Sequence, residues 1–409
     1  MLRPVIACLL AGVVPCAANA AILQANPTNL TTVFAAAQNG DTIVATGSFG
    51  SMALQNRTFT TRVTLDATNA IFNDTLTIKN VVGLNVLRGT FGSRTEPMRS
   101  ARAVAVQSSS SIKFQSNKFI GSGATTGQGA SLGLTILGSK SVQVTAASFS
   151  NLRLGLGVNT STDVKVSSNK FTGMTSDGIN IANSHRVTAT SNTCTGTVPF
   201  LGAHPDCIQL WSVFGQPVQS DIALLRNTAI GATQGFASFN ADDGGGLRIS
   251  MIGNIVTTSY PQGIACYNCF DSIFTDNVLS TLPDAKWRTS MNIVGGGNNI
   301  IANNSIAAFV KPVTATSLND GIEGIAASIG EDPVLMDRIE QLLLDDLALF
   351  RSGMLDPAAP SDDLGDFEMA SSRFSLASVG VPDVAVWAQL ILGFGLVGAL
   401  ARRKARQMA

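Results

Sequence analysis

The sequence has few charged residues. Only 13% of its 409 residues are Asp, Glu, Lys or Arg, about half the fraction that is usual for a soluble globular protein. The 27 basic residues balance the 27 acidic ones. A nucleic-acid-binding protein needs a basic surface, and an acid-rich disordered chain needs a large net charge. The composition therefore argues against both classes, and no nucleic-acid partner is expected.

Tyrosine and tryptophan are also scarce, with two and three residues, whereas the chain has 39 glycines. Ser, Thr and Asn are frequent throughout the sequence. Many short strands and tight turns with uncharged polar surfaces account for such a composition. It predicts an all-β or solenoid body.

The N-terminus has the features of a secretory signal peptide. A short basic start precedes an apolar run, Val5–Val14, that is too short to span a bilayer, and Ala18–Ala20 has the small-x-small pattern of a cleavage site. Residues 1–20 are therefore predicted to be a signal peptide. Lipidation at Cys16 is a weaker alternative, because a proline directly precedes this cysteine.

The C-terminus has the features of a membrane anchor. Val384–Ala401 is almost wholly apolar, and a basic cluster that includes Arg402 and Arg403 follows it. About 18 apolar residues can cross a bilayer, and the cationic cluster would stay on the cytoplasmic side. A buried core helix is the alternative, but a core helix rarely combines uniform apolarity with a basic end. The segment is therefore predicted to be a transmembrane helix.

The segment from Val381 to Arg406 contains a proline, Trp387-Ala388, a glycine-rich span and then the arginine cluster. In this order it resembles the PEP-CTERM sorting signal in its Trp-Ala variant, with Asp383 and Val384 at two of the three name-giving positions. The resemblance covers residues 381–409. It implies a Gram-negative bacterium that exports surface proteins alongside exopolysaccharide, a processing transpeptidase as partner, and an inner-membrane anchor with the body facing the periplasm before processing to the cell surface or matrix.

An internal repeat dominates the region between these ends. In each repeat an asparagine has an apolar residue three positions before it and another two positions after it. Such short units cannot bury an apolar face alone, so they stack, and the asparagines are expected to form an internal ladder. The repeat recurs around Asn117, Asn169, Asn192, Asn227, Asn254, Asn277 and Asn304, and Ala147 occupies the missing position.

Each repeat also has a second segment with alternating polarity. In Gly178–Ile181 and Cys207–Leu210 the alternation places the aliphatic side chains inside, and Asn180 and Gln209 outside. The two patterns together resemble the right-handed parallel β-helix of the pectin-lyase-like and NosD-like repeat proteins. The predicted fold class is therefore all-β, a right-handed parallel β-helix of about ten coils over residues 41–310.

Helices are expected at both ends of this solenoid. Thr28–Gln38 places its apolar residues on one face and would cap the N-terminal end, within residues 21–40. Asp332–Phe350 opens with an Asp-Pro pair typical of a helix start, and would cap the other end within a helical segment 311–355. Residues 356–380 are rich in Ala, Ser, Pro, Gly and Asp, and predict a flexible linker to the membrane helix.

A functional site is expected where a turn is expanded, because regular turns leave no room for one. The longest interval between rungs, from Asn192 to Asn227, holds an insertion, Thr197–Ala203. The segment that follows the insertion has a His-x-Asp-x-Ile-Gln pattern and resembles a motif of carbohydrate-active β-helix proteins. Its candidate side chains are His204, Asp206, Gln209 and Trp211.

Alignment of the turns places Asp206 beside Asp177, which opens the preceding strand, and neighbouring strands lie about 4.8 Å apart. Two carboxylates at this spacing either form an acid/base pair for glycoside chemistry or share a Ca²⁺ ion. The structural alternative is that both accept backbone N–H groups at strand starts. The functional hypothesis makes Asp206, Asp177 and His204 catalytic, and assigns substrate binding to Gln209, Trp211 and Asn180.

Asp242 and Asp243 follow the next strand and are candidate metal ligands, although Asp-Asp-Gly-Gly is also an ordinary turn sequence. The family resemblance implies that lyases of this fold use a Lys or Arg base, with Ca²⁺ neutralising the substrate uronate. Polygalacturonase-like hydrolases carry four motifs, of which only an Asp-Asp is present, and that family is disfavoured. His185 is expected in a solvated turn. The candidate basic residues are Arg153, Arg186, Arg248, Lys286 and Arg288.

Four cysteines remain after removal of the signal peptide. In an oxidising compartment, Cys194 and Cys207 could join across the insertion, and Cys266 and Cys269 could close a tight turn. Free buried thiols remain an alternative. A zinc site is disfavoured, because two of the cysteines are expected to point into the apolar core.

Two functions remain open from the sequence. The first is an anchored carbohydrate-active enzyme, a lyase or epimerase of an acidic polysaccharide. The second is a non-catalytic surface protein that binds matrix glycan, for which the fold alone is equally good evidence. An ice-binding solenoid is disfavoured because the outward positions vary from glycine to asparagine to glutamine.

Overall fold

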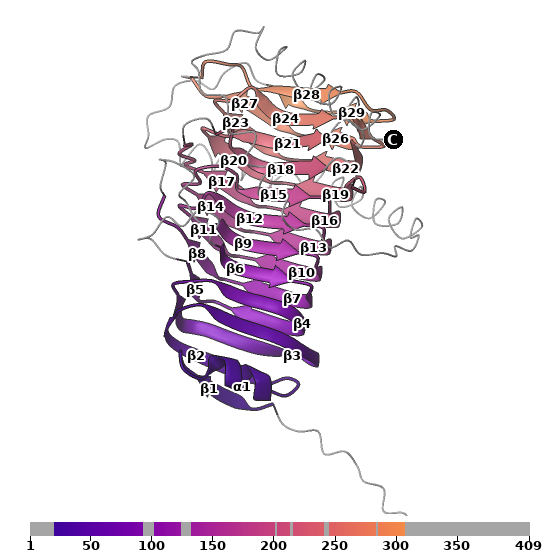
Figure 1. Cartoon of the computed structure of the whole chain (residues 1–409). Coiled ribbons are helices and arrows are strands. Elements are labelled where there is room, and N and C mark those ends of the chain that lie inside the picture. Colours follow the sequence, from indigo (N-terminus) through magenta and orange to yellow (C-terminus); the bar gives the residue numbers. More distant parts are fainter. Residues whose placement is uncertain are drawn as a thin grey trace, which may run out of the picture.

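The computed structural model describes residues 20–92, 102–123, 132–200, 203–212, 216–240, 245–283 and 285–306. The chain coils into a parallel β-solenoid of about nine turns, close to the ten that the sequence predicted (Figure 1). Every strand pairing given by the structure is parallel, and residues far apart in sequence pair one turn apart, as in His185 with Ser220. The all-β parallel solenoid is therefore confirmed, whereas its right-handed sense stays a prediction.

The strands form three rows of parallel neighbours along the solenoid, because each turn contributes one strand to each row. The first row contains β1 Ile22–Ala25, β2 Thr42–Phe49, β3 Met52–Phe72, β4 Leu76–Leu87, β7 Ser110–Gln115, β10 Lys140–Thr145, β13 Thr162–Ser167, β16 His185–Thr190, β19 Ser220–Leu225, β22 Gly246–Ile252, β25 Cys269–Phe270, β26 Ile273–Thr275 and β29 Ile300–Ala302. Strands β3 and β4 are long and also pair with members of the other two rows.

The second row consists of short strands: β5 Thr90–Phe91, β8 Lys118–Ile120, β11 Ser148–Ser150, β14 Lys170–Thr172, β17 Thr193–Thr195, β20 Thr228–Gly231, β23 Ile255–Thr258, β27 Val278–Thr281 and β30 Ser305–Ile306. The third row carries the candidate site and is called the site face: β6 Arg102–Gln107, β9 Leu132–Leu137, β12 Leu154–Asn159, β15 Ile179–Ala182, β18 Asp206–Ser212, β21 Gln234–Asn240, β24 Gln262–Tyr267 and β28 Ser290–Val294.

The predicted N-terminal helix is present but shorter than expected. Helix α1 spans Leu30–Ala36 and buries Leu30 and Phe34. It lies at the end of the solenoid beside β1 and β2 (Figure 1). Its cap residue Asn29 makes no side-chain capping bond to the helix, and so packing of the apolar face accounts for the helix.

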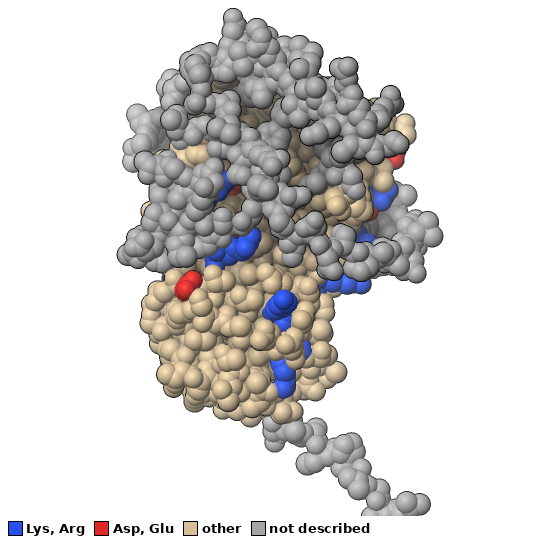
Figure 2. Space-filling view, in the orientation of Figure 1, with Lys and Arg blue, Asp and Glu red and all other residues tan. Residues whose placement is uncertain are grey.

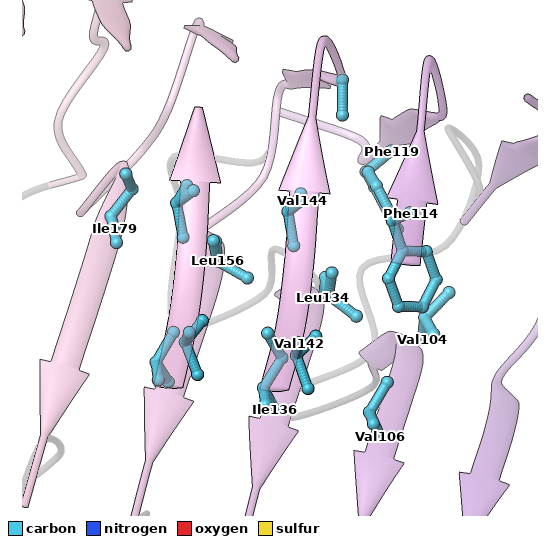
Figure 3. Close-up of a cluster of buried hydrophobic side chains, with 14 of the residues drawn as sticks. Val104, Val106, Phe114, Phe119, Leu134, Ile136, Val142, Val144, Leu156 and Ile179 are labelled. Atoms are coloured by element: carbon cyan, nitrogen blue, oxygen red, sulfur yellow. The ribbon is translucent and has the colours of Figure 1, made fainter. Parts of the chain in front are cut away.

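The interior of the solenoid is a continuous apolar column. Aliphatic side chains from neighbouring strands of one row, such as Val104, Leu134 and Leu156, are less than 2% exposed and stack turn upon turn (Figure 3). A row of phenylalanines adds aromatic stacking, with ring centroids 4.5 to 5.4 Å apart along the row. The stacked rings belong to Phe49, Phe72, Phe91, Phe119, Phe149 and Phe171.

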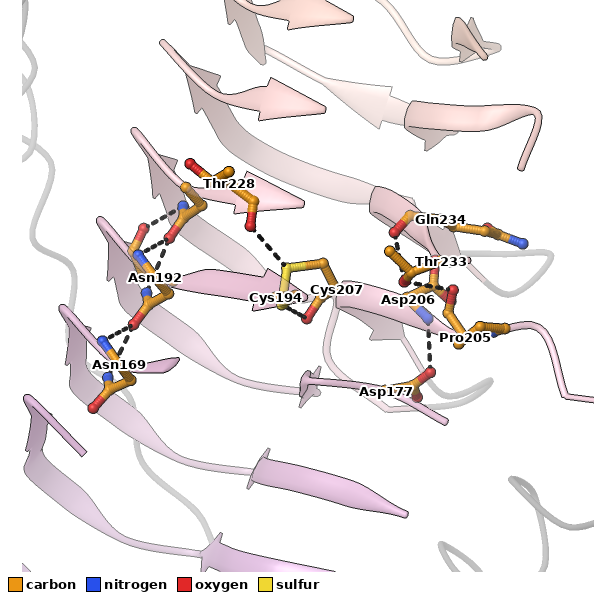
Figure 4. Close-up of a disulfide and its surroundings, with 12 residues drawn as sticks. Asn169, Asp177, Asn192, Cys194, Pro205, Asp206, Cys207, Thr228, Thr233 and Gln234 are labelled. Atoms are coloured by element: carbon orange, nitrogen blue, oxygen red, sulfur yellow. Dashed lines mark hydrogen bonds between the residues drawn. A yellow bond between two sulfur atoms is a disulfide. The ribbon is translucent and has the colours of Figure 1, made fainter. Parts of the chain in front are cut away.

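The predicted asparagine ladder is confirmed. Asn169 is fully buried, and its backbone N–H and its Nδ2 both donate to Oδ1 of Asn192, at 3.1 and 2.9 Å. The same pair of bonds connects each successive rung: Asn192 to Asn227, Asn227 to Asn254, Asn254 to Asn277 and Asn277 to Asn304. Figure 4 shows the rungs around Asn169 and Asn192.

The missing rung behaves as the sequence suggested. The backbone N–H of Ala147 donates to Oδ1 of Asn169 at 2.9 Å, as an asparagine there would. Nδ2 of Asn117 donates to the carbonyl oxygen of Val86, as the amide of Asn169 does to Val144 one turn back. Because Ala147 offers no side-chain acceptor, the second bond of Asn117 goes to the carbonyl oxygen of Arg88. The ladder therefore tolerates one apolar rung by redirecting one bond of its neighbour to a backbone acceptor.

Several predicted features lie outside the described residues. They are residues 1–19 of the signal peptide, the helix Asp332–Phe350, the linker 356–380, and the anchor 381–409 with its membrane segment Val384–Ala401. Within the part of the chain that the structure describes, no helix has the length and apolarity of a membrane span. Figure 2 shows sparse charges on the described surface of the first turns, consistent with the low charge of the whole chain.

Candidate functional site

The expanded turn brings the two predicted aspartates, Asp177 and Asp206, together where the site-face strands β15 and β18 begin. Asn180 pairs in register with Gln209, which places Asp177 opposite Asp206 three residues earlier. The backbone N–H of Asp206 donates to Oδ1 of Asp177 at 3.0 Å (Figure 4). The predicted adjacency is therefore confirmed, and the bond is also the backbone contact that the structural alternative expects.

A chain of polar contacts joins five of the six predicted side chains. Nδ2 of Asn180 donates to Oδ2 of Asp177 at 3.4 Å and also to Oε1 of Gln209. Nε2 of Gln209 donates to Oδ2 of Asp206 at 3.3 Å. The same oxygen of Asp206 lies 3.7 Å from Nδ1 of His204. The strand register and the insertion thus bring these five side chains together in one connected polar cluster.

The cluster differs sharply in exposure from one member to the next. The side chain of His204 is 49% exposed, whereas that of Asp206 is 0% exposed. A substrate on the surface can therefore contact the imidazole directly.

Burial and pairing shift the pKa values of all three titratable groups. Burial raises the pKa of Asp206 to about 7, although the contact with His204 opposes this shift. The contact with Asp206 raises the pKa of His204 to about 9, against the opposing effect of burial. Burial also raises the pKa of Asp177. At neutral pH the imidazole is therefore held in its cationic form next to the carboxylate of Asp206.

Trp211, the remaining predicted substrate-binding residue, lies on the outward side of β18 and is half-buried. Its register partner on β21 is Phe239, whose ring meets the His204 ring edge-on with centroids 6.2 Å apart. The structure therefore places an aromatic surface directly beside the imidazole. The substrate-binding roles of Trp211, Gln209 and Asn180 stay predictions.

Sequence reasoning missed three residues near the aspartates. Burial and the negative charge of Asp206 raise the pKa of Tyr260, which places this phenol close to the cluster. Gln234 pairs with Asp206 in register, and Gln262 occupies the same position on β24. A signal was available, because a polar residue followed by glycine opens β15, β21 and β24 alike.

That glycine is required by the close approach of successive turns. A Cβ atom added at Gly235 would lie 1.9 Å from the carbonyl oxygen of Gly263. Only glycine fits at this position, because any side chain would overlap the next strand. Gln234, the polar residue immediately before it, is thereby fixed at the start of β21.

A calcium ion between Asp177 and Asp206 does not fit this geometry. Asp177 already accepts the Asp206 N–H and Asn180, and the cationic His204 faces Oδ2 of Asp206. Within the described residues no cluster of three or more His, Cys, Asp or Glu side chains could hold a metal ion. Asp242 and Asp243 lie outside the described residues, and a Ca²⁺ requirement through them stays a prediction.

The basic residues considered for a lyase mechanism are engaged elsewhere. Arg186 forms a two-point ion pair with Asp163, and Arg248 forms one with Asp221, both in the first row. The guanidinium of Arg153 lies over the ring of Phe200 at 5.8 Å, and the ammonium of Lys286 lies 5.3 Å from the Trp287 ring. Nothing in the described structure distinguishes Arg288.

The prediction for His185 was wrong. It opens strand β16 rather than a turn and is half-buried, with Nδ1 2.9 Å from Oγ of Ser220. Burial lowers the pKa of His185. The error arose because Asn183 and Ser184 suggested a turn that ends one residue earlier.

Both predicted cysteine pairs are disulfide-bonded in the structure. Cys194 joins Cys207 and Cys266 joins Cys269, and all four residues are at most 1% exposed. The first bond links β17 to β18 immediately after Asp206 (Figure 4). It therefore fixes the strand that carries the site, and it lies in the core rather than over the insertion.

No protein-family model matches the chain, and no curated protein matches its sequence. Among solved structures, a surface adhesin of Streptococcus pneumoniae is 9% identical, with 66% of this chain and 79% of that chain covered and a TM-score of 0.45. An alginate lyase from Paenibacillus is 13% identical, with 70% and 99% covered and a TM-score of 0.38. A polygalacturonase from Erwinia carotovora is 10% identical, with 72% and 96% covered and a TM-score of 0.34. Such low values give no basis for assigning an activity.

Proposed function

We propose that this protein is a carbohydrate-active enzyme in which His204 transfers a proton to a polysaccharide bound on the site face. The observation that carries the proposal is the contact between a half-exposed imidazole and a fully buried carboxylate, His204 Nδ1 to Asp206 Oδ2 at 3.7 Å. A purely structural histidine has no need of a buried carboxylate, whereas a proton-transferring one is commonly oriented by such a group.

The cluster favours acid catalysis at neutral pH. Asp206 raises the pKa of His204 to about 9, so the imidazole is protonated and can donate to the leaving oxygen of a glycosidic bond. Nδ1 faces Asp206, which leaves Nε2 for the substrate. Asp177 holds the backbone N–H of Asp206 and so fixes the carboxylate.

The protonation state of His204 also bears on which reaction the enzyme catalyses. A lyase or epimerase of an acidic glycan needs a base at a ring carbon and a cation on the uronate. An imidazole held protonated is a poor base at neutral pH. Hydrolysis is therefore the form of the activity that we propose: His204 donates its proton to the glycosidic oxygen as the C1–O bond breaks, and a solvent water adds to the anomeric carbon and releases a proton to solvent. Export and membrane anchoring stay predictions from the sequence.

A panel of soluble neutral and uronate-containing polysaccharides tests the proposal. Incubation with the purified protein should release reducing ends from at least one polysaccharide. Ultraviolet absorbance should not rise in parallel, because no unsaturated sugar forms without β-elimination. A parallel rise would support the lyase instead, and binding without any turnover would support the non-catalytic glycan-binding protein.

The pH dependence of stability should reveal the buried pair. The folded pKa of Asp206 is raised, so the stability that its neutral form contributes is present at acid pH and is lost as the pH rises through about 7. The stability associated with protonated His204 is likewise lost as the pH rises through about 9. Asp206→Asn should therefore unfold at the same temperature as the parent near pH 4 and at a higher temperature above pH 7, as measured by circular dichroism. A variant that is less stable at alkaline pH would contradict these assignments.

A further inference from the structure

A row of acceptor oxygens without donors runs along the site face. Oδ1 of Asp206, Oε1 of Gln234 and Oε1 of Gln262 are all buried and have no hydrogen-bond partner within the described structure. The three residues are 1%, 3% and 8% exposed. They occupy the same register position on β18, β21 and β24, one turn apart. Figure 4 shows Asp206 and Gln234 on their neighbouring strands.

Such a row is costly for the free protein. Each buried acceptor without a donor costs about 1–3 kcal/mol, and native proteins contain few of them. Apolar side chains would remove this cost, and the same register position is in fact a leucine, Leu154, on the earlier strand β12. These oxygens have almost no accessible area in the free protein. A ligand that carries hydrogen-bond donors would satisfy them when the side chains turn toward it, and would explain why these turns keep polar residues.

A row of aromatic side chains accompanies the acceptors over the same three turns. Trp211, Phe239 and Tyr267 share one register position and are half-buried. The rings of Phe239 and Tyr267 are stacked, with centroids 5.9 Å apart and planes 16° apart. His204 connects the two rows, because its ring contacts both Asp206 and Phe239.

The aromatic row is confined to the turns that carry the acceptors. The corresponding residues on the preceding strands β12 and β15 are Asn159 and Ala182, and the residue on the following strand β28 is Val294. A merely structural stack would be expected to continue, as the internal phenylalanines do over six turns. Acceptors and rings therefore mark one surface of three turns.

We infer that β18, β21 and β24 form the substrate-binding surface, and that it takes a neutral, hydroxyl-rich glycan extended along the solenoid axis. The inference rests on the proposed function and gives its substrate class. Hydroxyl groups donate to the row of oxygens, and the apolar faces of the sugar rings pack on the aromatic row. A uronate would instead bring a carboxylate, which only accepts, against acceptors and the carboxylate of Asp206.

Binding measured without turnover tests the inference separately from the enzyme proposal. A His204→Gln background removes the proposed acid, and isothermal titration calorimetry then measures affinity for hydroxyethylcellulose, glucomannan, polygalacturonate and alginate. At least one neutral glycan should bind, and more tightly than either uronate polymer. Gln262→Met and Tyr267→Ala should each weaken that binding about tenfold or more. Gln143→Met, on β10 of the first row, is the matched control and should leave it unchanged.

Thermal unfolding of the free variants separates a ligand role from a structural one. Methionine conserves the volume of glutamine, and removal of an unpaired acceptor should leave Gln262→Met at least as stable as its parent. Preference for a uronate polymer, failure of both neutral glycans to bind, or unchanged affinity in the variants would overturn the inference. A CaCl2-induced rise in unfolding temperature that Gln262→Met abolishes would also overturn it, in favour of a cation. Neutral-glycan binding without turnover would refute the enzyme proposal alone.

Discussion

Replacing His204 with glutamine is expected to lower the rate of glycan cleavage by about 10²-fold or more while leaving the solenoid folded. Loss of a positioned proton donor typically costs 10²- to 10⁴-fold. The side chain of His204 is 49% exposed, so little apolar packing is lost with it. Glutamine keeps hydrogen-bonding groups near Oδ2 of Asp206 but transfers no proton. Initial rates of reducing-end release on the responsive polysaccharide measure the effect.

Replacing Asp206 with asparagine should affect a different measurement, the pH dependence of the rate. With the carboxylate removed, the pKa of His204 should fall from about 9 toward its ordinary value of about 6.5. The alkaline limb of the pH–rate profile should therefore move to lower pH, and activity at neutral pH should fall with it. A structural aspartate would change stability without moving this limb. An unchanged profile in a folded variant would therefore remove Asp206 from the mechanism.

The other histidine of the chain supplies the matched control. His185 is half-buried on β16, in the first row, and contacts Ser220 rather than any member of the cluster. His185→Gln should leave the cleavage rate within about twofold of the parent. If both histidine variants lose activity equally, general destabilisation rather than proton transfer explains the loss. If neither does, the proposed role of His204 is wrong.

The fold could be predicted from the sequence because most turns of the solenoid repeat the same pattern of apolar residues around an asparagine. The spacing around each asparagine specifies which residues point inward, and even the exception at Ala147 was readable as a rung. The adjacency of Asp177 and Asp206 followed from the same alignment. The repeat pattern thus determines the pairing register of the strands, because a shift of one residue would place apolar side chains on the outside.

The exposure of the site could not be predicted in the same way. Register gives the position of a side chain on a strand, but not what covers it. The sequence listed Asp206, Asp177 and His204 together as catalytic, and only the structure shows that the side chain of Asp206 is completely buried while that of His204 is half-exposed. Gln234 and Gln262 were overlooked because a glutamine has no charge to attract notice, and its importance appears only when its oxygen is found without a donor.

Replacing Asn227 with alanine is expected to lower the free energy of unfolding by about 3–5 kcal/mol. Oδ1 of Asn227 accepts the backbone N–H and Nδ2 of Asn192, both at 2.9 Å. Its Nδ2 donates to the carbonyl oxygen of Ala189 and to Oδ1 of Asn254. Four buried bonds disappear together, and each group left without a partner costs about 1–3 kcal/mol unless it finds another. Equilibrium unfolding in guanidinium chloride measures the loss.

Asn304, the last rung of the ladder that the structure describes, provides a control variant for which a smaller loss of stability is expected. Asn304 is only partly buried, and among the described residues its Oδ1 accepts from Asn277 alone. Asn304→Ala should therefore cost clearly less than Asn227→Ala, because water can replace its bonds. The redirected amide of Asn117 beside Ala147 shows the one route by which the interior could adapt. A loss below about 1 kcal/mol for Asn227→Ala would mean that Asn192 takes this route, and that the rungs specify register more than they stabilise the fold.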